Sequence, residues 1–153
     1  MRIVIIGIGV VVFSLIAADP PGFVIWKGDY LKGQEKKLAA KMSDKVATEN
    51  LARYGNHLVM VAHREGNGQA ELHETQADIF VVESGEATLV IGGTMPNRKT
   101  TAPNEVRSPS IQGGERKTLG PGDIVHIPAK IPHQLLVEAG KQITYAVVKV
   151  NSE

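Results

Sequence analysis

Short apolar segments separated by turn residues are the feature that most constrains the fold of this chain. From Asn56 onward no helical period persists, and segments such as HLVMVAHR and DIFVVESG are separated by turn sequences such as REGNG, LGPGD and EAGK. Apolar runs of this length, bounded by Gly, Pro, Asn and Asp, are typical of antiparallel strands in a sandwich or barrel. The sequence therefore predicts an all-β domain over residues 56–153.

The strands of this domain follow from the apolar runs. They are expected at residues 57–64, 70–73, 79–83, 87–91, 124–127, 134–137 and 144–150. Residues 92–119 are polar and too many for a plain hairpin, so we expect an insertion or functional loop with a short strand around residues 110–111.

One amphipathic helix is expected ahead of the β domain. The segment YLKGQEKKLAAKM, residues 30–42, places Leu31, Leu38 and Met42 at helical spacing with lysines between them. Before it, the breaker DPPG is followed by the apolar sequence FVIW, residues 23–26, which we expect to pair as an edge strand. We assign residues 19–55 to a leader and this helix.

The first eighteen residues differ from the rest of the chain. In MRIVIIGIGVVVFSLIAA, Arg2 precedes a nearly unbroken apolar run, and charge returns at Asp19. This pattern is typical of a secretory signal peptide, although an uncleaved anchor is the alternative, since a spanning helix needs about 20 apolar residues. We therefore expect a secreted or periplasmic protein with no stable membrane span after processing.

Composition narrows the chemistry further. The chain has no cysteine, which excludes thiolate ligands, disulfides and a cysteine nucleophile. Of 17 Lys+Arg and 16 Asp+Glu, only Arg2 lies in residues 1–18, so the processed chain is neutral. The lysines between residues 27 and 45 are expected on the solvated face of the helix, and no nucleic-acid partner is predicted.

Acidic residues and a histidine gather where the β core begins, in ELHETQAD, residues 71–78. Glu71 and His73 are two positions apart, so on a strand they point to the same face while Leu72 points to the other. The following ETQA leaves room for a turn, after which Asp78 would lie beside them. The pattern predicts a cluster of possible metal ligands.

A second segment, GDIVHIPAKIPHQ, residues 122–134, leads a short β run into a proline-bearing corner that carries His133. Together the two segments resemble the two motifs of the cupin superfamily. The second motif, G-x5-P-x-G-x2-H-x3-N, is matched by Gly122, Pro128 and His133, while Lys130 replaces its second glycine and Val137 its asparagine.

The first cupin motif, G-x5-H-x-H-x3,4-E-x6-G, is matched by counting back from Gly85. Asp78 then takes the acidic position, His73 the second histidine and Glu71 the first. A rival alignment with Thr75 as the second histidine leaves one residue too few before Asp78, so Thr75 is expected in a turn. The resemblance spans residues 66–137.

The resemblance implies a double-stranded β-helix, or jelly-roll barrel, that holds one divalent metal through Glu71, His73, Asp78 and His133. Imidazole and carboxylate ligands suit Mn, Fe, Zn, Ni or Co. The replacement of one motif histidine by Glu71 leaves a second interpretation open, in which the pocket has lost its metal.

The other three histidines have less defined roles. His57 and His63 share one face of their strand and would line the pocket if that face points inward; otherwise they are residues of the strand ends. Two prolines and an irregular corner separate His126 from His133. Alternation along a strand therefore does not predict whether the two side chains share a face, and His126 is left unassigned.

Two classes of function are implied by the resemblance. One is a metal-dependent enzyme of isomerase, lyase or dioxygenase type acting on a small polar molecule. The alternative is a non-catalytic module that binds a small ligand or a metal. Because fold does not decide between them, both are carried forward, together with an expected homodimer.

Overall fold

The computed structural model describes residues 19–152, so the expected signal peptide at residues 1–18 lies outside the described residues. Within that range one helix precedes eleven strands, which form two antiparallel sheets. No helix among residues 19–152 is long and apolar enough to cross a membrane.

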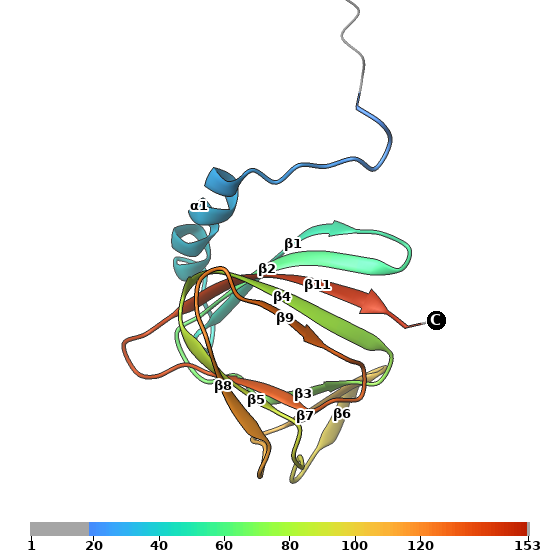
Figure 1. The fold of residues 1–153 in the computed structure, drawn as a ribbon, viewed down its shortest axis with the longest axis vertical. Coiled ribbons are helices and arrows are strands. Elements are labelled where there is room, and N and C mark those ends of the chain that lie inside the picture. The colour runs from blue at the N-terminus through green and yellow to red at the C-terminus, as the bar shows by residue number, and fades with distance from the viewer. Residues whose placement is uncertain (1–18, 153) are drawn as a thin grey trace, which may run out of the picture.

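The two sheets face each other across the core (Figure 1). The first has the order β1 (Val46–Arg53), β2 (His57–Arg64), β11 (Ile143–Asn151), β4 (Gln76–Gly85) and β9 (Ile124–Ile127). The second has the order β6 (Lys99–Ala102), β7 (Glu105–Ser108), β3 (Ala70–His73), β10 (His133–Leu136), β5 (Ala87–Ile91) and β8 (Glu115–Leu119). The chain crosses repeatedly from one sheet to the other, which makes a double-stranded β-helix and confirms the predicted fold class.

Alternating side chains of both sheets build the main core. Phe80 and Val82 on β4 are buried, while the alternate residues Ile79 and Val81 are only partly covered, as expected for a strand with one face inward. Phe80 packs on Tyr145 of β11 with ring centroids 5.0 Å apart. The core thus fills one part of the space between the sheets and leaves the other part for polar side chains.

A smaller apolar cluster covers the outer face of β3. Ala70 and Leu72 pack there with Met95 and Val106. Because neighbours on a strand point to opposite faces, this outer packing turns Glu71 and His73 toward the interior. The burial of Leu72 therefore helps to fix the direction of the two polar residues beside it.

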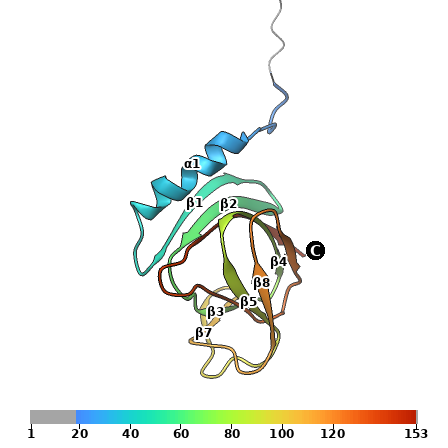
Figure 2. The same ribbon diagram turned by 60° about the vertical axis from the view of Figure 1, so that its left-hand side comes forward.

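Helix α1 (Gly28–Ala39) lies across the outside of the five-stranded sheet (Figure 2). It begins two residues earlier than expected and ends before residue 42. On the helix itself, Gln34 and Leu38 are buried. Lys32, Lys36 and Lys37 are exposed, as expected for a solvated lysine face.

The expected edge strand at residues 23–26 is wrong. These residues form no strand, and Phe23, Val24 and Ile25 are about half exposed. The sheet edge is occupied instead by β1, whose residues pair with β2. The apolar pattern did not predict this strand, because its sequence VATENLAR is largely polar. A strand at the edge of a sheet needs few apolar residues.

Most of the other strand predictions are confirmed, four of them with the same bounds. The strand expected at residues 79–83 extends to residues 76–85, and the last two strands are shifted or lengthened by one residue at their ends. In the insertion, the strand expected around residues 110–111 is wrong: the segment carries β6, β7 and β8, and Gln112 only bridges Thr94. Residues 110–111 are held instead by hydrogen bonds to side chains, including Ile111 N to Gln134.

Gly85, from which the first motif was counted, supports a testable prediction. Its φ is +76°, and an added Cβ would overlap the carbonyl oxygen of Gln142 and lie 2.7 Å from its carbonyl carbon. Gly122 also has a positive φ, +89°, but an added Cβ would meet nothing within 4 Å. Both substitutions by Ala introduce left-handed strain, which costs about 1–2 kcal/mol, and only Gly85→Ala adds a backbone clash.

We therefore expect Gly85→Ala to lower the free energy of unfolding by about 3 kcal/mol or more and Gly122→Ala by about 1 kcal/mol. Urea denaturation of the two variants beside the wild type measures both losses. Equal losses would show that the close approach of Gly85 to Gln142 does not limit the choice of residue there.

Candidate metal centre

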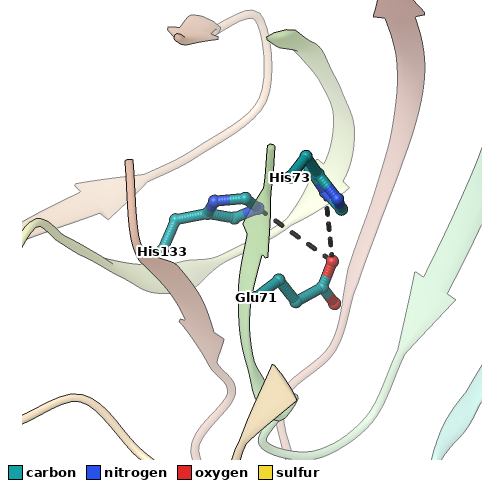
Figure 3. Close-up of side chains that lie close together, drawn as sticks. All are labelled: Glu71, His73 and His133. Atoms are coloured by element: carbon teal, nitrogen blue, oxygen red, sulfur yellow. Dashed lines mark ion pairs between the residues drawn. The ribbon is translucent and has the colours of Figure 1, made fainter. Parts of the chain in front are cut away.

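The central site is built on two adjacent strands of the six-stranded sheet. Glu71 on β3 pairs in register with His133 on β10, so their side chains lie next to each other, and His73 follows two residues along β3 on the same face. One ligand atom of each of these three residues lies within 4.8 Å of those of the other two. Figure 3 shows the two imidazoles directed at the Glu71 carboxylate.

The two imidazoles are oriented by partners on their outer sides. Nδ1 of His133 lies 3.1 Å from the carbonyl oxygen of Ile131, and Nδ1 of His73 lies 2.8 Å from Oε1 of Glu105. The inner Nε2 atoms lie 4.0 Å and 3.7 Å from Oε2 of Glu71. His133, which donates from its outer nitrogen, presents an inner lone pair, which is the arrangement found in metal-ligating histidines. His73 is held on its outer side by the ion pair with Glu105.

Nε2 of His133 is a buried polar atom without a hydrogen-bond partner among the described residues. Leaving such a group unpaired costs about 1–3 kcal/mol. A cation placed between Nε2 and the neighbouring carboxylates would satisfy it.

Asp78, the fourth predicted ligand, lies beside this cluster but has another partner. It stands opposite Lys149 in the pairing of β4 with β11, and Nζ of Lys149 lies 3.0 Å and 3.1 Å from its two oxygens. Oδ2 of Asp78 is 3.2 Å from Nε2 of His73 and 3.7 Å from Nε2 of His133. Asp78 thus belongs to the site, with both oxygens held by an ammonium group.

The same ammonium group also reaches the ligand cluster, because Nζ of Lys149 lies 2.7 Å from Nε2 of His73. A positive charge therefore already stands beside one ligand nitrogen. Sequence reasoning did not find Lys149, since the last strand has no motif and its pairing with Asp78 depends on the long-range register of β11.

Two guanidinium groups hold the other side of Glu71. Its Oε1 forms an ion pair with Nη1 of Arg107 and lies 3.5 Å from Nη2 of Arg64. Arg64 also donates from Nε to the hydroxyl of Tyr145 at 3.0 Å, and Arg107 lies 3.3 Å from Glu105. Glu71 therefore turns one oxygen to the arginines and the other to the imidazoles.

Burial and charge pairing set the protonation of the site. Burial opposes a charge on His73, but hydrogen bonds to Asp78 and Glu105 outweigh it and raise the pKa of His73 to about 9. Burial lowers the pKa of His133, which keeps that imidazole neutral. Burial also opposes the charge on Asp78, yet His73 and Lys149 keep the pKa of its carboxyl below the usual value.

A cavity of about 310 Å³ opens beside these groups. Its charged and polar wall includes Arg64, Glu71, Asp78, Arg107, His133, Tyr145 and Lys149, and its apolar wall includes Met60, Ala62, Phe80, Leu135 and Val147. The inward residues of β2 are Met60, Ala62 and Arg64, so the opposite face carries His57 and His63.

The remaining histidines thus lie away from the centre. His63 is buried, with Nδ1 2.8 Å from the hydroxyl of Thr144, and His57 contacts Asn56. His126 is exposed. The period-two pattern of β2 could have indicated Arg64, whereas Glu105 and Arg107 lie in the insertion, whose strands the sequence did not predict.

Comparison with known proteins indicates the class of protein that has this fold. No family model and no curated sequence matches the chain. Among solved structures, a double-stranded β-helix domain protein from Klebsiella pneumoniae is 16% identical, with 84% of this chain and 90% of that chain covered and a TM-score of 0.57.

Two enzymes share the same fold. The polyketide cyclase RemF from Streptomyces resistomycificus is 17% identical, with 70% of this chain and 66% of that chain covered and a TM-score of 0.51. The DMSP lyase DddQ from Ruegeria pomeroyi is 18% identical, with 73% of this chain but only 50% of that chain covered and a TM-score of 0.52. The chain thus spans about two thirds of the cyclase and half of the lyase.

These likenesses define the class: the protein has the fold of the cupin, or double-stranded β-helix, proteins, as its motifs predict. Its Glu71, His73 and His133 form a buried cluster that could hold a metal. The donor set fits such an ion, because two anchored imidazoles and one carboxylate oxygen converge and Nε2 of His133 has no other partner among the residues that the structure describes.

The pair of Asp78 and Lys149 supports a second prediction. Asp78→Asn leaves the ammonium of Lys149, whose side chain is 17% exposed, without its anion, and we expect a loss of about 2–4 kcal/mol in the free energy of unfolding of metal-free protein. Adding Lys149→Met should recover much of that loss, because removing both charges of a buried pair is often close to neutral.

The measurement is a double-mutant cycle by urea denaturation in the presence of a chelator. The pair Glu138→Gln and Lys141→Met, whose ion pair is exposed, provides the control and should show a coupling near zero. If Asp78 and Lys149 also show no coupling, the ammonium group is not held by this carboxylate.

Proposed function

We propose that the protein is a metal-dependent cupin enzyme that binds one divalent ion through Glu71, His73 and His133 and acts on a small polar molecule. The observation that carries the proposal is the convergence of two anchored imidazoles on the free oxygen of Glu71. Two histidines and one carboxylate leave coordination positions open for a substrate, as in catalytic zinc and non-haem iron sites.

A bound Mn, Fe, Zn, Ni or Co ion would supply Lewis acidity toward an oxygen-bearing substrate or, for iron, a site for dioxygen. The protein's own groups have separate tasks. Glu105 and the carbonyl of Ile131 orient the imidazoles, and the apolar wall around Phe80 excludes water from the reacting atoms. The ammonium group of Lys149, at the cavity wall, would place N–H donors close to the point where a substrate would meet the ligands.

Asp78 is proposed as a supporting group of the site. Its two oxygens bind Lys149, and its 3.2 Å contact with His73 stabilises that ring. This assigns three of the four predicted ligands to the metal and the fourth to the groups around it. Secretion and a homodimer stay predictions that rest on the sequence.

The proposal predicts the metal content of the purified protein. We expect about one equivalent of divalent metal in wild-type residues 19–153 and nearly none in the double variant His73→Ala and His133→Ala, since two of three ligands are lost. Mass spectrometry of metals after dialysis measures it. The control carries His57→Ala and His126→Ala, which remove histidines outside the cluster, and should keep the full equivalent; an unchanged content in the first variant contradicts the proposal.

A second function is favoured by one observation, the 2.7 Å approach of Lys149 to His73. An ammonium group at this place supplies the positive charge that a metal would otherwise supply. In this alternative the protein is a non-catalytic module that binds a small ligand in the cavity without a metal.

Lys149→Met separates the two functions. If the protein is a metal enzyme, wild type binds Co²⁺ with unit stoichiometry and Lys149→Met binds it about tenfold more tightly, because the competing charge beside His73 is gone. If the alternative holds, wild type binds no Co²⁺ and only the variant does. Calorimetric titration measures both, and Lys99→Met, which removes an exposed lysine of β6, should match wild type.

A further inference from the structure

We propose that the cavity binds a small organic oxyanion, with its carboxylate or phosphate group between Arg64 and Arg107 and its body against the apolar wall. This inference names the substrate class of the proposed function and rests on that function for its catalytic meaning. The placement of the two guanidinium groups, the charges around them and the size of the cavity all favour such a ligand.

The two guanidinium groups converge on a single carboxylate oxygen. Arg64 on β2 and Arg107 on β7 come from opposite sheets and both approach Oε1 of Glu71. Two arginines thus share one negative charge there, although Arg107 also contacts Glu105. Both line the cavity, and their side chains are 15% and 31% exposed, so they are partly covered and still reachable from it.

Each arginine keeps a donor nitrogen for a ligand. Among the residues that the structure describes, the ion pairs of Arg107 use Nη1 and Nη2, which leaves Nε. A guanidinium group has five N–H donors in a rigid fork that matches the geometry of carboxylates and phosphates. Among the described residues, the hydrogen bonds and ion pairs of Arg64 use Nε and Nη2, which leaves Nη1. This nitrogen lies beside Gly68, where an added Cβ would come within 3.0 Å of it. A glycine at this position thus leaves room for the arginine head.

The charge balance of the site favours an anion once a metal is bound. Arg64, Arg107 and Lys149 are paired with the three acids Glu71, Asp78 and Glu105. Metal ligation requires both imidazoles in their neutral form, so the proton of His73 must leave when an ion binds. The six charged groups then cancel, and a divalent ion brings two unmatched positive charges into a partly buried space. An uncompensated buried charge is costly, and an anionic ligand is the component that would compensate it.

The size and lining of the cavity limit the ligand. A volume of 310 Å³ equals about ten water molecules at about 30 Å³ each, which restricts the ligand to a small molecule. Met60, Phe80 and Val147 form an apolar part of the wall of the same cavity. The cavity therefore fits one anionic group attached to a small apolar body better than a sugar rich in hydroxyl groups or a nucleotide.

Benzoate, phenyl phosphate and benzamide test this inference. Benzoate and phenyl phosphate carry the two kinds of oxyanion on the same ring, and benzamide is a neutral molecule of nearly the same shape as benzoate. We expect at least one of the two anions to bind the Co²⁺-loaded full chain with a millimolar or tighter Kd, and benzamide about tenfold or more weakly. The stronger of the two anions identifies the source of the oxyanion.

Two arginine variants locate the binding. Arg107→Leu removes the more exposed guanidinium group, and we expect it to weaken binding of the preferred anion by about tenfold to a hundredfold. Arg107→Lys keeps the charge without the fork and should recover only part of the affinity. Arg53→Leu, on the exposed end of β1, is the control and should bind like wild type. Thermal denaturation of each variant shows that it is folded.

The inference is overturned if benzamide binds as tightly as both anions, or if Arg107→Leu binds them as wild type does. Its failure is distinguishable from that of the metal proposal, because the titrations are repeated with chelator-treated protein. Anion binding that needs Arg107 without any metal supports the oxyanion site alone, and unit metal binding without anion binding overturns the oxyanion site alone.

Discussion

The need to match charge inside the barrel is the constraint on which the rest of this structure depends. Asp78 is 2% exposed, and the side chain of Glu71 is 16% exposed. Moving such groups out of water costs several kcal/mol each unless partners surround them. Three strands that line the cavity supply the positively charged partners: β2 carries Arg64, β7 carries Arg107 and β11 carries Lys149.

The register of strand pairing in the two sheets places these cations beside the acids. Glu71 stands opposite both His133 on β10 and Arg107 on β7, so one residue of a central strand has a ligand on one side and a cation on the other. Asp78 meets Lys149 through the same kind of pairing in the other sheet. A shift of one residue in either strand would turn these side chains to the outer face, so the site and the fold depend on the same register.

Local periodicity predicted that Glu71 and His73 share a face, and the resemblance to the cupin motifs added Asp78 and His133 to the expected ligands. The parity of Glu71 and His73, the turn at Thr75 and the corner before His133 all involve residues close together in the chain. The structure brings Glu71, His73 and His133 into one cluster that could hold a metal. The cations could not be predicted in this way, because Arg107 and Lys149 reach the site only through pairing between distant strands. The polar strands β1, β6 and β7 were missed for a related reason, since their stability comes from their neighbours more than from apolar residues of their own.

The departure from the cupin motif, with Glu71 in place of a histidine, explains why this site carries so many cations. A histidine at this position would be neutral, whereas Glu71 adds a negative charge that must be balanced whether or not a metal is bound. The arginines bind Oε1 and leave Oε2 facing the imidazoles, so the carboxylate can serve both sets of partners at once. At an effective dielectric constant of 20, two unit charges 4 Å apart interact by about 4 kcal/mol. A metal ion bound at Oε2 would therefore weaken the ion pairs of Glu71 with Arg64 and Arg107. The N–H groups of both arginines would then be more available to a second anion. Metal binding and oxyanion binding would in this way be coupled through a single carboxylate.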